Sequence, residues 1–357
     1  TRGRAIVVDI GGTTTDVASI VDGRPEITAD GASVAGHHTM VEAIDLTTSG
    51  LGGDSEVRTD IGDAAFGLGP TRAIPLSRLA GRHPDIVDAL ASELASPTSR
   101  GQGRFPLSAE GVPAGEEPTV GSSARVSTFT PTDAAVVLGW VEAKPVEREA
   151  ATLGAELLAR RSDPQGTKIA DSAAAFAELV IDQLIARSAA LVVAAARKAD
   201  QLDAHPLPQG DEILEAGLRH HRGFLAVDVA VDADLVAVGA AASSYYPEVA
   251  NRIGARLVAP QHGDVANAVG AAVGTVRVEA QLTITRPRAG RYEVHGAIST
   301  IDRGCAYRTL DDAKVAALEA LTAEVVETAT AEGAERETLE VVDRWRASTA
   351  MVAGREL

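Results

Sequence analysis

Two aspartates bracket a short run of glycines and threonines near the start of the chain. Asp9 follows the apolar residues 5–8, Asp16 closes the run, and between them stand Gly11, Gly12, Thr13, Thr14 and Thr15. Glycine allows backbone N–H groups to converge on an anion without a Cβ in the way, and threonine hydroxyls add donors. The segment predicts a phosphate cradle in which Thr13, Thr14 and Thr15 contact β- and γ-phosphates. An ordinary glycine-rich hairpin, with threonines suited to strands, is the alternative.

The residues after this run distinguish it from two common phosphate loops. Residues 17–21 predict a strand, and Asp22-Gly23 predicts a hairpin turn. A P-loop requires a Gly-Lys-Ser/Thr ending followed by a helix, and a dinucleotide-binding loop also precedes a helix. Because a strand follows here and the loop has no lysine, both loops are excluded.

The two aspartates have separate predicted roles. Without a lysine in the loop, the charge of a phosphate must be offset by a metal ion, and Asp9 is placed to hold Mg²⁺ or its waters. Asp16 either orients an attacking hydroxyl or water, or caps the turn. The residues leave these two roles open.

Other candidate site residues lie further along the chain. Gly52 and Gly53 precede Asp54 in a second glycine-rich turn, where Asp54 either holds substrate or metal or is an ordinary turn aspartate. Small residues after an apolar strand would let adenine or ribose lie against the backbone, and they are Gly239, Ala240 and Ala241. Adjacent histidines point apart on a strand, so we favour a structural role for His37 and His38 over that of ligand or base.

Composition limits the partners and the compartment. The chain has 357 residues, enough for two domains, and a net charge of −17 with no basic run. This charge argues against nucleic acid or an anionic membrane as a partner. The single cysteine, Cys305, rules out an internal disulfide and favours the cytoplasm. Residues 173–196 are apolar, but three charges among them, on Glu178, Asp182 and Arg187, predict a buried amphipathic helix rather than a membrane span.

The order of apolar and glycine-rich segments predicts an α/β core over residues 1–275 and a small α+β domain over residues 276–357. Within the core, residues 97–131 predict a surface excursion and residues 145–200 a helical segment. Further predicted core elements are strands over 224–230, 235–238 and 257–259, a helix over 248–254 opened by Pro247, and a helix capped by Asp264. In the second domain we expect strands over 276–285 and 292–295, a helix over 310–331, and a strand within 339–351.

Several segments of the chain resemble those of a known family. Residues 9–17 resemble the phosphate-binding hairpin of the actin/hexokinase (ASKHA) superfamily and, more narrowly, of the hydantoinase/oxoprolinase (hydantoinase A-like) family. Further segments match the family in order, and they are residues 39–45 with 50–55, residues 132–139, and residues 238–247 with 265–270. The signature resembles the mid-chain copy found in that family, so the chain resembles the C-terminal half of a longer protein.

The resemblance implies an RNase H-like (actin-like ATPase) fold, here one half of the duplicated ASKHA core. It implies ATP and Mg²⁺ as cofactors, with catalytic roles for Asp9, Asp16 and Asp54. It places the nucleotide against Gly11, Gly12, the three threonines and residues 239–241. Implied partners are the N-terminal half of the protein, a hydantoinase B-like subunit and further copies of the chain.

The activity implied by this resemblance is ATP-dependent hydrolysis of a cyclic amide of the hydantoin or 5-oxoproline type. Phosphorylation of the amide carbonyl oxygen would create a leaving group, after which water opens the ring. A subunit of an ATP-dependent acetone- or acetophenone-type carboxylase is one alternative. The other is a nucleotide-binding half-domain that is inactive alone.

Overall fold

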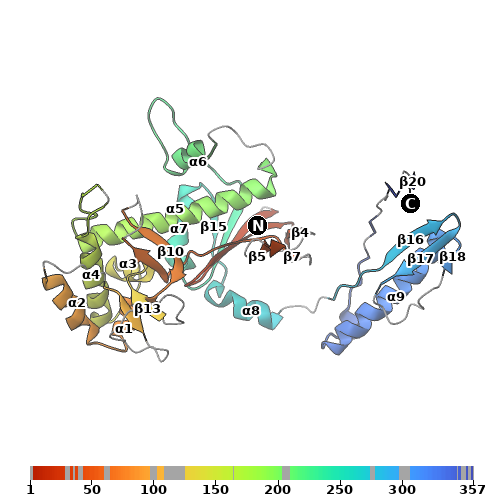
Figure 1. The fold of residues 1–357 in the computed structure, drawn as a ribbon, viewed down its shortest axis with the longest axis horizontal. Coiled ribbons are helices and arrows are strands. Elements are labelled where there is room, and N and C mark those ends of the chain that lie inside the picture. Colours follow the sequence, from red (N-terminus) through yellow and green to blue (C-terminus); the bar gives the residue numbers. More distant parts are fainter. Residues whose placement is uncertain are drawn as a thin grey trace. The chain divides into compact units, whose positions relative to one another are not determined.

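The computed structural model describes residues 3–28, 33–34, 37–38, 43–59, 65–96, 103–107, 125–163, 165–202, 210–273, 278–296, 306–343, 345–346, 351–352 and 355–356. The chain forms two compact units, Thr1–Val269 and Gly270–Leu357 (Figure 1). The division falls within helix α8 (Ala266–Val273). The sequence predicted an α/β core that ends at residue 275 and a small α+β domain after it.

A mixed sheet forms the centre of the first unit. Strand β1 lies between a parallel neighbour, β14, and an antiparallel neighbour, β2; the sheet order is β15-β14-β1-β2-β3, and β8 also pairs with β2. The strands are β1 (Arg4–Ile10), β2 (Thr15–Val21), β3 (Arg24–Pro25), β8 (Leu46–Ser49), β14 (Asp234–Val238) and β15 (Arg256–Val258). Their register sets Asp9 opposite Asp16 on β2 and beside Val238 on β14.

Alternating apolar residues define strands β1 and β2, and a suitable turn joins β2 to β3. Val8, Ile10 and Val17 are buried with at most 1% exposure. The turn after β2 has positive φ at Asp22 (49°) and Gly23 (78°), which matches the right-handed twist of the strands. The predicted strand over 17–21 and the predicted turn are confirmed.

Helix α5 (Ala173–Ala199) is the principal core helix of the first unit. The Ser172 hydroxyl caps its start by accepting from Ala175 N (3.1 Å). The helix contacts α3, α4, α7, β1 and β2, and the Phe176 ring lies 5.6 Å from those of Phe66 and Phe129. Among the described helices, α5 alone is long and apolar enough to cross a membrane. Its place in the core accounts for that composition.

The remaining elements of the first unit surround the sheet and α5. The helices are α1 (Leu76–Ala80), α2 (Ile86–Ala95), α3 (Pro131–Val137), α4 (Pro145–Ala159), α6 (Gly210–Leu218) and α7 (Ala242–Arg252). Short strand pairs are β4 (Ile27–Thr28) with β7 (Ala43–Ile44), β5 (Ser33–Val34) with β6 (His37–His38), and β9 (Ser55–Arg58) with β10 (Gly67–Arg72). A three-stranded sheet joins β11 (Ile74–Pro75), β13 (Arg125–Thr128) and β12 (Phe105–Leu107).

The structure corrects several predicted elements of this unit. Residues 224–230 form no regular strand, because only a single bridge between Arg222 and Ala226 supplies a partner. Helix α7 begins at Ala242 and contains Pro247, since the small residues before the proline already adopt helical conformation. Asp264 lies in a 3₁₀ turn (Gly263–Val265), and helix α8 begins two residues later at Ala266. Strands β14 and β15 confirm the predictions for 235–238 and 257–259. Much of the predicted excursion over 97–131 lies outside the described residues.

The second unit is a small α+β element. Its three-stranded sheet contains β16 (Thr283–Arg288), β17 (Arg291–His295) and β18 (Ala306–Tyr307), and helix α9 (Leu310–Ala331) contacts β17 and β18. A 3₁₀ turn (Arg336–Thr338) and the pair β19 (Met351–Val352) and β20 (Arg355–Glu356) follow. The predicted helix over 310–331 is confirmed, whereas β16 begins at Thr283 rather than at 276.

Candidate phosphate-binding site

The turn between β1 and β2 presents glycine backbone and one exposed threonine. Gly11 N donates to Thr14 O (3.0 Å), which closes the turn. Thr13 is exposed at its tip, while Gly11 and Gly12 are half-buried. Thr13 is therefore the threonine of this turn that is most open to solvent.

The structure departs from the prediction for Thr15. Its side chain is fully buried, and its hydroxyl donates to Leu51 O (2.6 Å). The physical reason is strand alternation: Thr15 points inward with Val17, away from Asp16. The Thr15 hydroxyl thus fixes the hairpin to the next loop instead of facing a phosphate.

Asp9 and Asp16 are direct partners across the two strands. Side chains at such positions lie side by side on one face of the sheet, and like charges there repel each other. Thr14 Oγ1 (3.2 Å) and Thr48 Oγ1 (2.6 Å) donate to Asp16. Within the described part of the chain, neither aspartate forms an ion pair with a basic side chain. A cation would relieve the repulsion between them.

Asp9 also lies at the junction of three segments. Asn267 Nδ2, on α8, donates to Asp9 Oδ2 (3.0 Å). Gly239, which follows β14, has a φ of +98°, and a Cβ on it would lie 2.7 Å from Asp9 Oδ1 and 2.3 Å from Ile10 O. The Gly239 turn therefore packs its backbone against the end of β1, as only glycine permits.

The metal-ligand set around Asp9 is small. In the ranges that the structure covers, no cluster of three or more His, Cys, Asp or Glu side chains is placed to hold a metal. Mg²⁺ commonly takes one or two carboxylates and completes its shell with water and substrate phosphates. The Asp9–Asp16 pair fits that pattern, with Asp9 as the less engaged carboxylate.

A second loop packs directly on the hairpin. Gly53 N donates to Gly11 O (3.1 Å) and Asp54 N donates to Gly12 O (2.8 Å). A Cβ on Gly52 would lie 2.6 Å from Gly11 O and 2.7 Å from Gly12 O. The glycines of residues 52–53 thus allow the two backbones to touch.

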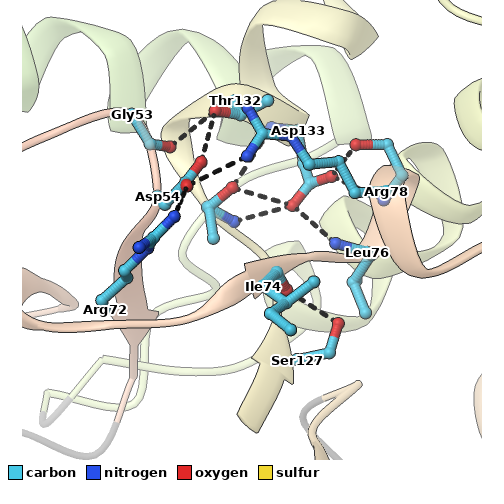
Figure 2. A network of polar contacts seen from close by, with 11 residues as sticks. Gly53, Asp54, Arg72, Ile74, Leu76, Arg78, Ser127, Thr132 and Asp133 are labelled. Atoms are coloured by element: carbon cyan, nitrogen blue, oxygen red, sulfur yellow. Dashed lines mark hydrogen bonds and ion pairs between the residues drawn. The ribbon is translucent and has the colours of Figure 1, made fainter. Parts of the chain in front are cut away.

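Asp54 is held by two arginines (Figure 2). Its side chain is 2% exposed, and its Oδ2 accepts from Arg72 Nη2 (3.2 Å) and from Arg78 Nη1 (3.1 Å). Thr132 Oγ1 lies 3.2 Å from Asp54 Oδ1 and 2.8 Å from Gly53 O. These contacts favour the alternative of a satisfied turn aspartate over a carboxylate that binds metal.

A buried carboxylate positions the segments that carry these partners. Asp133 accepts from the backbone N of Leu76 (3.1 Å), from N and Oγ of Ser77 (2.8 and 2.6 Å), and from N and Oγ1 of Thr130 (3.0 Å each). It therefore joins the start of α1, which carries Arg78, to the start of α3, which carries Thr132. Burial raises the pKa of Asp133 to about 6, and hydrogen bonds from Ser77, Thr130 and Leu76 lower it in part.

The residues predicted for an adenosine-binding segment lie beside the same loops. Ala241 is the residue before α7, and its Cβ would be 3.9 Å from a Cβ on Gly53. Ala240 is exposed. The structure therefore brings the hairpin, residues 52–54 and residues 239–241 to one place. The side chains of His37 and His38 lie outside the described residues, as do residues 39–42 and Cys305.

Comparison with known proteins identifies the family. A model of the hydantoinase/oxoprolinase family matches residues 1–280. The chain belongs to the hydantoinase/oxoprolinase family. No protein with a curated function matches it at a significant level.

One solved structure shares the fold of this hydantoinase/oxoprolinase family member. It is a nucleotide-free acetone carboxylase, described as catalysing ATP-dependent acetone carboxylation, with 17% identity and a TM-score of 0.52. The match covers 94% of this chain and 36% of that one. The chain thus spans about a third of that protein's length, and the likeness concerns the fold alone.

Sequence reasoning missed three residues of this family member's site. Arg72 and Arg78 reach Asp54 from 18 and 24 residues further along the chain, and no local pattern marks them. Asn267 lies within a segment that resembles the family, but that segment gave it no role. Strand alternation was the available signal for the inward side chain of Thr15.

Proposed function

We propose that this chain contributes a Mg²⁺-dependent ATP site to an enzyme that hydrolyses a cyclic amide of the hydantoin or 5-oxoproline type. The Asp9–Asp16 pair carries the proposal: two facing carboxylates without a basic partner among the described residues, beside a glycine turn. Bound there, Mg²⁺ would offset the charge of the phosphates. The order of the central sheet, antiparallel at β2 and parallel from β1 to β15, supports an RNase H-like fold.

In the proposed reaction the amide oxygen attacks the terminal phosphorus of ATP, and the bond to the ADP oxygen breaks. Water then adds to the amide carbon, and the C–N bond breaks with a proton passing to nitrogen, which leaves an acyl phosphate. A second water attacks the acyl phosphate, so that a carboxylate forms and phosphate leaves. This chain supplies positioning through the Gly11–Gly12 backbone and Thr13, the main contribution of proteins to phosphoryl transfer. Asp16, held by Thr14 and Thr48, orients the attacking group.

Nucleotide binding is the step that can be tested on this chain, because it spans only 36% of the solved relative. We expect Asp9→Asn to weaken MgATP binding about tenfold or more in calorimetry, since a charged ligand to the metal is lost. ATP binding in EDTA should change little. Asp88→Asn, at an exposed site on α2, is the matched control. Equal MgATP affinity of Asp9→Asn and the unmodified chain would refute the site.

A ketone carboxylase subunit is the second candidate, favoured by the shared fold with acetone carboxylase. The two candidates differ in the co-substrate. ATP turnover by the whole protein that depends on bicarbonate and a ketone would support the carboxylase. Turnover that depends on hydantoin or 5-oxoproline would support the amidohydrolase. We place both candidates in the cytoplasm, in complex with further subunits or copies.

A further inference from the structure

Two arginines converge on a single carboxylate oxygen next to the hairpin. Arg72 Nη2 and Arg78 Nη1 both bond Oδ2 of Asp54, whose side chain is 2% exposed. The arginine side chains are 58% and 59% exposed. The acid is therefore buried while both guanidinium groups remain accessible.

The charges of this cluster do not cancel. At Asp54 one carboxylate faces two guanidinium groups, so these three side chains carry a net charge of +1 within a chain whose net charge is −17. Each guanidinium has five N–H donors in a planar fork, and the bonds to Asp54 use one nitrogen of each. Free donors and excess positive charge favour a second oxyanion.

Another arginine–aspartate pair in the chain has a different geometry. Arg256 bonds Asp234 through two nitrogens, Nε at 2.8 Å and Nη2 at 2.5 Å, and the Asp234 side chain is fully buried. Arg256 therefore engages its aspartate through two nitrogens, whereas each arginine on Asp54 uses only one in its bond to the carboxylate.

The cluster is adjacent to the turn that would hold phosphate. A Cβ on Gly12 would lie 2.5 Å from Asp54 Oδ2, the oxygen that both arginines contact. Both guanidinium groups thus donate to Asp54 Oδ2, and this oxygen lies against Gly12 of the hairpin turn. An anion held between them would lie beside a phosphate on Gly11–Thr13.

We propose that Arg72 and Arg78 form an oxyanion-binding subsite for either the terminal phosphate of the nucleotide or a carboxylate of the second substrate. Asp54 positions the two guanidinium groups, and Asp133 positions Asp54's partners through α1 and α3. The proposal deepens the proposed function and rests on it. It also supplies the cationic groups that the lysine-free loop lacks.

The test is calorimetric titration of the chain with inorganic phosphate and with acetate, in EDTA and without nucleotide. Charge-assisted hydrogen bonds of this kind are each worth about a factor of ten in affinity. We therefore expect Arg72→Gln and Arg78→Gln each to weaken phosphate binding about tenfold and the double variant more. Arg256→Gln is the matched control and should leave the affinity unchanged. Circular dichroism checks that every variant is folded.

Nucleotide titrations then distinguish the two sources of the anion. If the double variant weakens MgATP binding but not MgADP binding, the subsite holds the terminal phosphate. If it loses phosphate and acetate binding but keeps both nucleotide affinities, the subsite holds a substrate carboxylate. An unmodified chain that binds neither anion, or variants that bind them as well as the unmodified chain, would overturn the proposal. The phosphate and acetate titrations in EDTA do not depend on Asp9 or Mg²⁺, so they are separate from the test of the ATP site.

Discussion

Replacing Gly239 with alanine should disrupt the junction between β14 and the end of β1. The backbone at Gly239 has a φ of +98°, which side chains other than glycine rarely adopt. An added Cβ would also lie 2.3 Å from Ile10 O and 2.7 Å from Asp9 Oδ1. The added Cβ would therefore press on the end of β1 at both Asp9 and Ile10.

Two effects add to the expected loss of stability. The left-handed backbone costs alanine about 1–2 kcal/mol, and overlap with backbone atoms costs about 1–3 kcal/mol. We therefore expect Gly239→Ala to lower the free energy of unfolding of the first unit by about 2–5 kcal/mol. MgATP binding should weaken as well, because Asp9 is displaced.

The assay is urea unfolding followed by circular dichroism, with Gly139→Ala as the control. Gly139 has a φ of +74°, and nothing lies within 4 Å of its Cβ position. Its substitution should therefore show the backbone cost alone, about 1–2 kcal/mol. If Gly239→Ala is no more destabilising than Gly139→Ala and binds MgATP normally, the close packing of Gly239 against Asp9 is refuted.

Two further predictions concern buried polar groups. Because folding raises the pKa of Asp133 from 3.8 to about 6, the folded chain keeps a proton that the unfolded chain loses as pH rises between these values. The free energy of unfolding should fall by about 3 kcal/mol from this group. The variant Asp133→Asn cannot titrate at this position, so its free energy of unfolding lacks this decrease. In urea unfolding, the difference in free energy of unfolding between the unmodified chain and Asp133→Asn should therefore become smaller from pH 4 to pH 7. A difference that stays constant over this range would contradict the raised pKa of Asp133. Thr15→Val should cost about 1–3 kcal/mol by leaving Leu51 O buried without its donor; the exposed Thr48→Val should cost less, and equal losses would argue against the Thr15 bond.

The hairpin was predictable because its determinants are local. Alternating apolar residues define β1 and β2, and glycines and threonines define the turn between them. The same alternation would have shown that Thr15 points inward with Val17. The predicted strand over 224–230 failed for a different reason. A strand forms only where a partner edge exists, and residue types do not report that edge.

The partners of Asp54 could not be predicted in the same way. Arg72, Arg78 and Thr132 reach it over 18 to 78 residues of chain. Their convergence depends on how α1 and α3 start, which Asp133 sets through backbone donors on both helices. The sequence shows that two glycines precede Asp54, but the charge of the groups around Asp54 emerges only from the packed fold.

The carboxylates beside the hairpin therefore differ in their partners. Asp9 and Asp16 face each other without a basic partner among the described residues, and a phosphate there would require a metal ion. Asp54 carries two arginines, so an anion bound to them would not require a metal ion. Together, the two proposals place a metal ion at Asp9 and an oxyanion at Arg72 and Arg78, both beside the Gly11–Gly12 turn. When that oxyanion is the terminal phosphate, the accessible N–H donors of the arginines can offset charge as it develops during transfer.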